Sequence, residues 1–393
     1  MIFIFLIWAV LCSGQSQAQA KYEDISQPAF WMEGNAGPWG PGNPFYELRT
    51  PLRIKLISYL NSNPSTIPRL QEVFGEHADK IEADLTALLD AQMIGELDIL
   101  SGEPVYAPTF AILTASDLEL LYPLMGRAAT GFTVEIYDSK EELDRIMAET
   151  GLDVQYRLPV FLAFIRDKFF YEYMEKKDLF PSKKGLCPKH GEGNFYGAES
   201  FQPLHSKVKF GVTHAMIGPF SFVYIDPPYF DSGSLFSAWG FQGPWQAKET
   251  FARILKTVSR TKPTGMERIQ KTFRKKESQQ HIPDMVAYLA SQEVLAASEG
   301  GYVNVSARLK RRTIRPLKEL SERAAAIVAE FIAGAELAEL YPKTAPGRNR
   351  ISLAEFREAV AWQTIWATTG YLDEKGFFAG SAEDGRELYV FER

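Results

Sequence analysis

Apolar residues recur at helical spacing over three segments near the start of the chain. Leu52, Leu56 and Leu60 share one face of a predicted helix, which ends at an Asn-Ser-Asn-Pro-Ser stretch. A second, shorter helix is predicted over 66–74 and a third over 76–92. The next residues, MIGELDILSGEPVYAPTF, alternate between apolar and polar around a Ser-Gly-Glu-Pro turn, which is typical of a β-hairpin. The pattern therefore predicts three helices followed by a hairpin.

These four segments also match, in order, the parts of a known kind of domain. TPLRIKLISYL corresponds to its first helix, STIPRLQEVFG to the helix before the turn, DKIEADLTALLDAQMIGE to the recognition helix and its exit, and LDILSGEPVYAPT to the wing. Over 48–113 the chain thus resembles the ArsR-like winged-helix regulators. The resemblance implies a winged helix, DNA binding as in that family, and an association compatible with a homodimer. The metal-sensing cysteines of the family are absent, so metal regulation is not implied.

The charge of the predicted recognition helix argues against DNA binding. A helix that enters the major groove approaches phosphates, and regulators place basic or neutral polar residues on it. Here the ionisable residues are mostly acidic: Glu76, Asp79, Glu82, Asp84 and Asp90 stand against Lys80 and His77. We therefore expect this unit to contact protein rather than to read DNA.

The remainder of the chain has a mixed pattern. Residues 114–250 are predicted to form a mixed α/β region, with a strand over 131–139 and a long aromatic-rich helix over 158–180. Residues 251–393 are predicted to be mainly helical and basic. The end of the chain, from Ser352, has the pattern of a helix, a glycine exit and a hairpin, so it is a candidate for a second winged-helix-like unit.

Composition and charge narrow the class of protein. With 393 residues, 46% apolar and 13% aromatic, the chain can form two or three cores. A net charge of −6 argues against a protein that coats nucleic acid over its whole surface. The charge is uneven, because residues 254–320 hold 14 Lys and Arg against 6 Asp and Glu. A local basic surface remains compatible with the sequence.

The first twenty residues have the pattern of an export signal. An apolar stretch from Ile2 to Leu11 is followed by polar residues and by Ala18-Gln-Ala20, a small-x-small site of the kind that signal peptidase cleaves. We therefore predict a signal peptide over 1–20 and a periplasmic or extracellular protein. The alternative is a start at Met32, which predicts a cytoplasmic protein.

One short motif indicates a possible enzyme. Asp226, Pro227, Pro228 and Tyr229 follow the apolar strand FSFVYI, and this DPPY string resembles the motif of adenine-N6 DNA methyltransferases. In that family the acid and a backbone carbonyl bind the target amino group, and the aromatic ring stacks on the flipped base. The family also needs a Gly-rich turn for S-adenosylmethionine, which this chain lacks. The alternative is a strand that ends in a proline turn.

A second cluster has metal-binding side chains. Cys187 and His190 form a Cys-x-x-His pair, and His205 and His214 follow within 28 residues of the cysteine. Four such ligands could close a tetrahedral zinc site with a structural role. The alternative is a buried cysteine with surface histidines.

A third cluster consists of basic side chains. Arg308, Lys310, Arg311 and Arg312 are candidates for nucleic-acid binding, because clustered cations neutralise phosphates. The alternative is that they pair with acidic groups of the same chain, whose other regions are strongly acidic.

Taken together, these patterns predict a multidomain α+β protein. The predicted parts are a signal peptide over 1–20, a Gly- and Pro-rich linker over 21–47, a winged helix over 48–113, a mixed α/β domain over 114–250 and a helical basic domain over 251–393. The predicted function is non-enzymatic binding or regulation, with a protein partner and without a cofactor. The alternatives are an enzyme with a site in 187–229, dependent on zinc or S-adenosylmethionine, and a DNA-binding regulator that starts at Met32. No segment after the signal has the length of a membrane span, and the oligomeric state stays open.

Overall fold

The computed structural model describes residues 30–34, 41–75, 78–181, 195–199, 212–225, 239, 244–273, 280–309, 311–381 and 388–392. Over these residues the protein is an α+β structure in which helices predominate and the strands form small sheets. The sequence predicted this class correctly. No helix in these ranges has both the length and the apolar character that a membrane span needs. The predicted signal peptide lies outside them.

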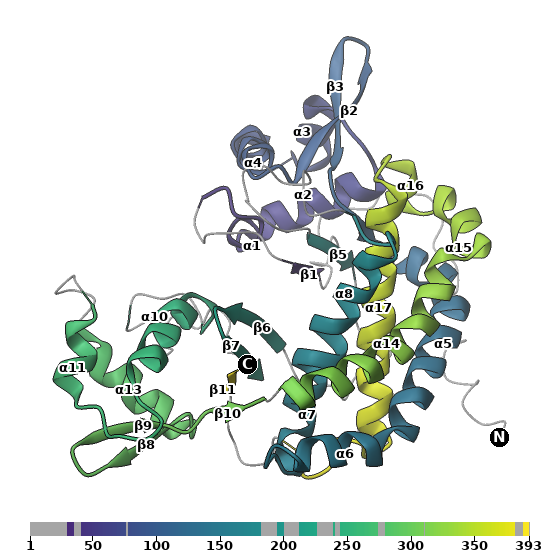
Figure 1. Cartoon of the computed structure of the whole chain (residues 1–393). Helices are drawn as coiled ribbons and strands as arrows, with labels where there is room; N and C mark the ends of the chain where they lie inside the picture. Colours follow the sequence, from purple (N-terminus) through teal and green to yellow (C-terminus); the bar gives the residue numbers. More distant parts are fainter. Residues whose placement is uncertain are drawn as a thin grey trace.

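The chain runs twice through a similar series of elements (Figure 1). The first half, over 30–199, contains β1 (Phe30–Gly34), α1 (Pro44–Glu47), α2 (Pro51–Ser62), α3 (Ile67–Val73), α4 (Ala78–Asp90), β2 (Ile94–Leu100), β3 (Glu103–Pro108), β4 (Ile112–Leu113), α5 (Ala115–Asp138), α6 (Lys140–Ala148), η3 (Val154–Tyr156), α7 (Arg157–Val160), η4 (Phe161–Phe169), α8 (Phe170–Lys176) and β5 (Phe195–Glu199). The second half, over 212–392, contains β6 (Val212–Ile217), β7 (Phe220–Ile225), α10 (Pro244–Thr257), α11 (Met266–Lys271), α13 (Ile282–Ser291), β8 (Leu295–Ser298), β9 (Gly301–Asn304), β10 (Ala307–Arg308), α14 (Arg311–Ala333), α15 (Ala335–Leu340), η5 (Tyr341–Lys343), α16 (Ala345–Arg348), α17 (Leu353–Glu374) and β11 (Leu388–Glu392).

Helices α2, α3 and α4 and the hairpin β2–β3 form what we call the first unit, residues 51–108. Its core consists of the apolar positions whose spacing predicted the helices, including Leu56, Leu60, Ile81 and Leu88, all fully buried. An isolated antiparallel bridge between Ser65 and Tyr106 ties the loop before α3 to the hairpin. The predicted helices and hairpin are thus all present in this unit.

Helices α10, α11 and α13 and the hairpin β8–β9 form a second unit, residues 244–304, with the same order and the same ties. Thr264 forms an isolated bridge with Tyr302, as Ser65 does with Tyr106. The amide of Val294 donates to the carbonyl of Leu289 at 2.9 Å, and the amide of Met93 donates to that of Leu88 at the same distance. The second unit has its own apolar core, which also includes side chains of β7 and β11.

The two larger sheets repeat the same strand pattern. In the order β1-β5-β4, strand β5 is antiparallel to β1 and parallel to β4. In the order β10-β11-β7-β6, strand β11 is antiparallel to β7 and parallel to β10. The registers of the two antiparallel pairs also correspond. The first residue of β1, Phe30, lies opposite the last residue of β5, Glu199, and the first residue of β7, Phe220, lies opposite the last residue of β11, Glu392. Among the described residues, strand β6 of the second sheet has no counterpart in the first.

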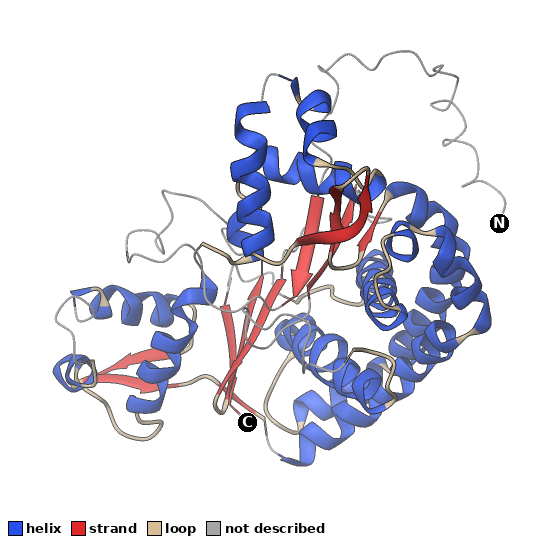
Figure 2. Ribbon diagram, turned by 90° about the horizontal axis from the view of Figure 1, so that it is seen from above, coloured by secondary structure: helices blue, strands red, loops and turns tan. Residues whose placement is uncertain are grey.

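The long helices of the two halves form one bundle, in which each half covers the other (Figures 1 and 2). Helix α5 of the first half packs on α14 of the second, while α17 packs on α5, and η4 and α8 pack on α14. Their buried side chains form a single core that runs through both halves. The last long helical segment of each half therefore lies against the long helix of the other half.

Polar contacts join the halves along this bundle. Arg323 of α14 donates to Glu135 at 2.8 Å and to Glu142 at 2.7 Å, which belong to α5 and α6. The buried guanidinium of Arg166, in η4, lies over the ring of Trp366, in α17, with its carbon 4.5 Å from the ring centroid. The two halves thus meet through charged groups as well as apolar ones.

The structure corrects several predictions for the regions outside the first unit. The expected strand over 131–139 is the end of α5, which begins at a capping box of Thr114 and Asp117 and continues to Asp138. The expected linker over 21–47 contains β1 and α1; Pro44 occupies the first position of α1, where a missing amide costs nothing. The predicted boundary at 250 falls inside α10.

The C-terminal segment does not form a unit of its own within the described residues. Helix α17 packs on α5 and α14, and β11 joins β7 and β10 in a sheet. The repeat that the sequence suggested from Ser352 onward is found instead over 244–304. The sequence from Ser352 predicted a separate helix-and-hairpin unit. The same pattern, a helix followed by glycine and then by apolar residues, also arises when the helix belongs to a bundle and the apolar residues form one strand of a sheet.

Gly131 sets how closely α5 approaches α14. A β-carbon at this position would lie 2.8 Å from Cγ2 of Ile327, which is too close for an unshifted contact. We predict that Gly131→Ala lowers the free energy of unfolding by about 1–3 kcal/mol, because the helices must separate or Ile327 must change rotamer. Gly126→Ala in the same helix is the control. It meets no atom within 4 Å and is expected to stabilise the protein by up to about 1 kcal/mol. Equal effects in chemical denaturation would contradict this packing.

Candidate functional site

Most of the sequence-predicted enzyme and metal residues lie outside the part of the chain that the structure describes. This holds for Cys187, His190 and His205, and for the DPPY residues 226–229, which follow the end of β7. His214 belongs to β6, where only the backbone is described. Within the described ranges, no three His, Cys, Asp or Glu side chains form a group that could hold a metal ion. The zinc and methyltransferase predictions therefore stay predictions.

The basic residues 308–312 are spread over two elements. Arg308 is exposed at the end of β10, and Arg311 is the first residue of α14, while Lys310 lies outside the described residues. The exposed Arg312 donates from Nη2 to the backbone carbonyl of Glu149 at 3.0 Å. Because Glu149 follows α6 as its C-cap, this cation sits where the negative end of the helix dipole favours it. At least one of these side chains thus serves a contact within the chain.

The outward face of α4 is acidic. Asp79, Glu82 and Asp90 are exposed, and Lys80 is the only basic residue of the helix. Asp84 differs from the expectation, because it is buried and accepts a bond of 2.7 Å from Nε of Arg53 in α2. Arg53 also pairs with Glu47. Asp84 therefore ties α4 to α2, and the exposed charges of α4 are the other three acids and Lys80, which leaves an acidic excess.

The equivalent face in the second unit has little charge. Its helix α13 exposes Asp284, Ala287 and Ser291. The two units also differ in total charge, with 4 Lys and Arg against 9 Asp and Glu over 51–108, and 10 against 6 over 244–304. The two units therefore have net charges of opposite sign, −5 and +4, on one scaffold.

The sequence contains a signal for the second unit that the pattern of apolar residues alone did not reveal. PSTIPRLQEVF, residues 64–74, and PTGMERIQKTF, residues 263–273, share Pro, Arg, Gln and Phe at equivalent positions. Both segments begin one residue before the bridge residue and end just after the second helix of their unit. The spacing before them differs, since four residues separate α2 from α3 and eight separate α10 from α11. This difference hides the repeat from a search at one fixed period.

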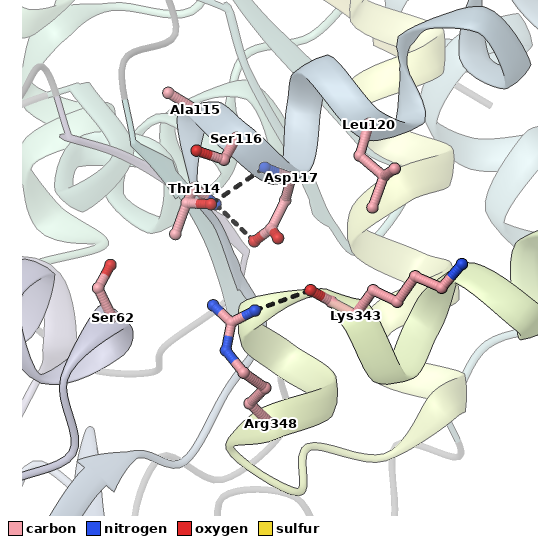
Figure 3. A pocket seen from close by; sticks show the side chains of 8 residues that line it. All are labelled: Ser62, Thr114, Ala115, Ser116, Asp117, Leu120, Lys343 and Arg348. Atoms are coloured by element: carbon pink, nitrogen blue, oxygen red, sulfur yellow. Dashed lines mark hydrogen bonds between the residues drawn. The ribbon is translucent and has the colours of Figure 1, made fainter. Parts of the chain in front are cut away.

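A pocket lies where the first unit meets the bundle and α16 (Figure 3). It has a volume of about 440 Å³ and is lined by Ser62, Thr114, Ala115, Ser116, Asp117, Leu120, Lys343 and Arg348. Arg348 donates to the carbonyl of Lys343 at 2.7 Å. Next to the pocket, Nδ2 of Asn349 donates to the carbonyl and side-chain oxygens of Asn61. The pocket is therefore part of the joint between the halves.

Asp117 holds this joint together through backbone groups. Its Oδ2 accepts from the amide of Thr114 at 2.9 Å and from that of Ala345 at 3.2 Å, which belong to the starts of α5 and α16. Burial raises the pKa of this carboxyl, and the hydrogen bonds from Thr114 and Ala345 oppose the shift without cancelling it. With both amides bound, Asp117 is a capping residue of two helices rather than a candidate base.

Comparison with known proteins adds no relative. No family model, no curated protein and no solved structure matches this chain. Its function must therefore be inferred from its own geometry.

The raised pKa of Asp117 predicts how the stability of the joint depends on pH. The folded protein favours the protonated carboxyl, so the contribution of Asp117 to stability is largest below its ordinary pKa of 3.8 and falls as the pH rises through the raised value. Asp117→Asn keeps one oxygen that can accept from both amides and does not titrate. We predict that wild type loses stability relative to this variant between pH 3 and pH 7 in urea unfolding.

The control is Asp117→Ala, which leaves two buried amides without an acceptor and is expected to cost about 2 kcal/mol or more at any of these pH values. A wild type that gains stability relative to the asparagine variant as the pH rises would contradict the direction of the shift.

Proposed function

We propose that this chain is a non-enzymatic binding or regulatory protein with two winged-helix units, and that its first unit contacts protein rather than DNA. The observation that carries the proposal is the acidic face of α4, the helix at the position of a recognition helix. A helix that approaches phosphates is repelled when its exposed charges are Asp79, Glu82 and Asp90 against Lys80 alone. The same charges suit a partner with basic groups.

The reciprocal packing of the two halves supports a role in binding. Dimeric regulators place two equivalent units on a common helical interface, and this chain has both units and the interface within one polypeptide. Two binding surfaces on one chain raise the effective concentration of the second contact once the first has formed. When both units belong to one chain, their sequences can also differ, and here the two units have net charges of opposite sign.

The basic groups of the second half do not require a nucleic-acid ligand. Arg312 caps α6, and Arg260 pairs with Glu392 at 2.5 Å and donates to Ser306. These contacts favour intramolecular roles for part of the basic charge. Nucleic acid stays the alternative partner, for the second unit above all.

The role of α4 can be tested with duplex DNA. Ala83 is exposed on the same face of α4 as the acids. We predict that Ala83→Trp leaves the DNA affinity of the chain unchanged within about twofold, since α4 makes no DNA contact in the wild type. Replacing Asp79 and Glu82 together by Lys should raise the affinity by about tenfold at low salt, because the repulsion becomes attraction. Fluorescence anisotropy with a labelled random duplex measures both changes.

Glu330→Lys with Glu339→Lys is the matched control. It changes the net charge by the same amount at exposed positions of the bundle, so it reports the effect of net charge alone. Tight duplex binding by wild type that Ala83→Trp abolishes would show that α4 reads DNA, and the proposal would be wrong.

A further inference from the structure

The hairpins of the two units differ in length although the units share their fold. Strands β2 and β3 have 7 and 6 residues, whereas β8 and β9 have 4 each. The second unit folds around a short hairpin with a polar tip at Ser298 and Glu299. The extra length of the first hairpin is therefore not needed for the fold and requires another explanation.

The tip of the long hairpin exposes two large apolar side chains. Ile99 is 68% exposed and Leu100 is 64% exposed, the highest values among the large apolar residues that the structure describes. They are neighbours in one strand, so they point to opposite faces of the hairpin, where Ile99 lies opposite Pro104 and Leu100 opposite Glu103. The tip is thus apolar on both faces, as a wedge that enters a groove would be.

The tip is also held in a defined place. Arg350 donates to the carbonyl of Leu97 at 3.0 Å, at the irregularity of the hairpin, and to Asp98 at 3.3 Å. At the far end, Ser101 and Gly102 both have positive φ, as a tight hairpin turn requires. Figure 1 shows the hairpin β2–β3 projecting away from the bundle and from the second unit. A fixed, projecting tip loses little conformational freedom when it binds.

Acidic groups surround the apolar tip. Glu96, Asp98 and Glu103 are exposed on its strands. Arg350 pairs with Asp98, and no Lys or Arg occurs in the sequence between Lys80 and Arg127. Phosphates of nucleic acid and anionic lipids would both be repelled by this charge. The complement of an apolar tip with an acidic border is an apolar pocket with a basic border.

We propose that the tip of the first hairpin, residues 98–104, inserts into an apolar pocket on a partner protein, and that Lys or Arg side chains of the partner border this pocket. The inference rests on the proposed function, since it names the chemistry of the protein that the first unit contacts. Ile99 and Leu100 supply the buried contact, and Glu96 and Glu103 pair with the border.

Site-specific photocrosslinking of the full-length chain tests this proposal. A benzophenone amino acid is placed at Leu100, at Ser298 on the short hairpin as the matched control, and at Ala83 on α4. Each protein is irradiated in an extract of its own source cells, and the crosslinked peptides are sequenced by mass spectrometry. We expect the Leu100 product to join another protein at an apolar segment flanked by Lys or Arg. Replacing Glu96 and Glu103 by Lys should lower its yield at least about fivefold, and Ser298 should give no such product.

Three outcomes would overturn the proposal. In the first, the products at Leu100 contain lipid, nucleic acid or a second copy of this chain. In the second, the yield of the product does not respond to the charge reversal. In the third, Leu100 gives no product above the Ser298 control. Ala83 separates this inference from the proposed function. Protein products at Ala83 with none at Leu100 leave a protein-contacting first unit that does not use its hairpin tip. Nucleic-acid products at both Ala83 and Leu100 overturn the inference about the hairpin tip and the proposed function together. The charge reversal at Glu96 and Glu103 should leave the unfolding free energy unchanged, because both side chains are exposed, so a folding defect cannot imitate lost binding.

Discussion

The close packing of α5 on α14 is the contact on which the rest of the structure depends. Each of these helices is also covered by the last long helical segment of the other half, α17 on α5 and α8 with η4 on α14. The apolar core is consequently shared, and either half alone would expose much of it to water. The chain is best understood as a dimer-like pair within one polypeptide.

This arrangement fixes the two three-helix units at separate places on a common core. The first unit is joined to α16 through Asn61 and Asn349, and the second packs its core on β7 and β11. The two units of a homodimer would have the same net charge, whereas the two units of this chain have net charges of opposite sign. The two units therefore differ in net charge while both are fixed on the same core.

The sequence predicted local structure well and long-range packing poorly. The helices of the first unit follow from the spacing of Leu56, Leu60 and Ile81, because a single buried face sets that period. By contrast, the end of α5 contains Phe132, Thr133 and Val134, which favour a strand locally, and its helix is stabilised by packing on α14. The partner of the buried Asp84 could not be predicted either, since Arg53 lies 31 residues away in the sequence. The acidic surface of α4 could be predicted, but the exposed hairpin tip stood out only once the two units could be compared.

The most direct test of the fused pair is to cut the chain between its halves. A specific protease site inserted after Gln202 allows cleavage of the folded protein, and size-exclusion chromatography with light scattering then gives the mass of what remains associated. The account predicts that both fragments stay together as a one-to-one complex that only denaturant separates, because each covers the apolar face of the other. Two fragments that separate and each stay folded and soluble would contradict it.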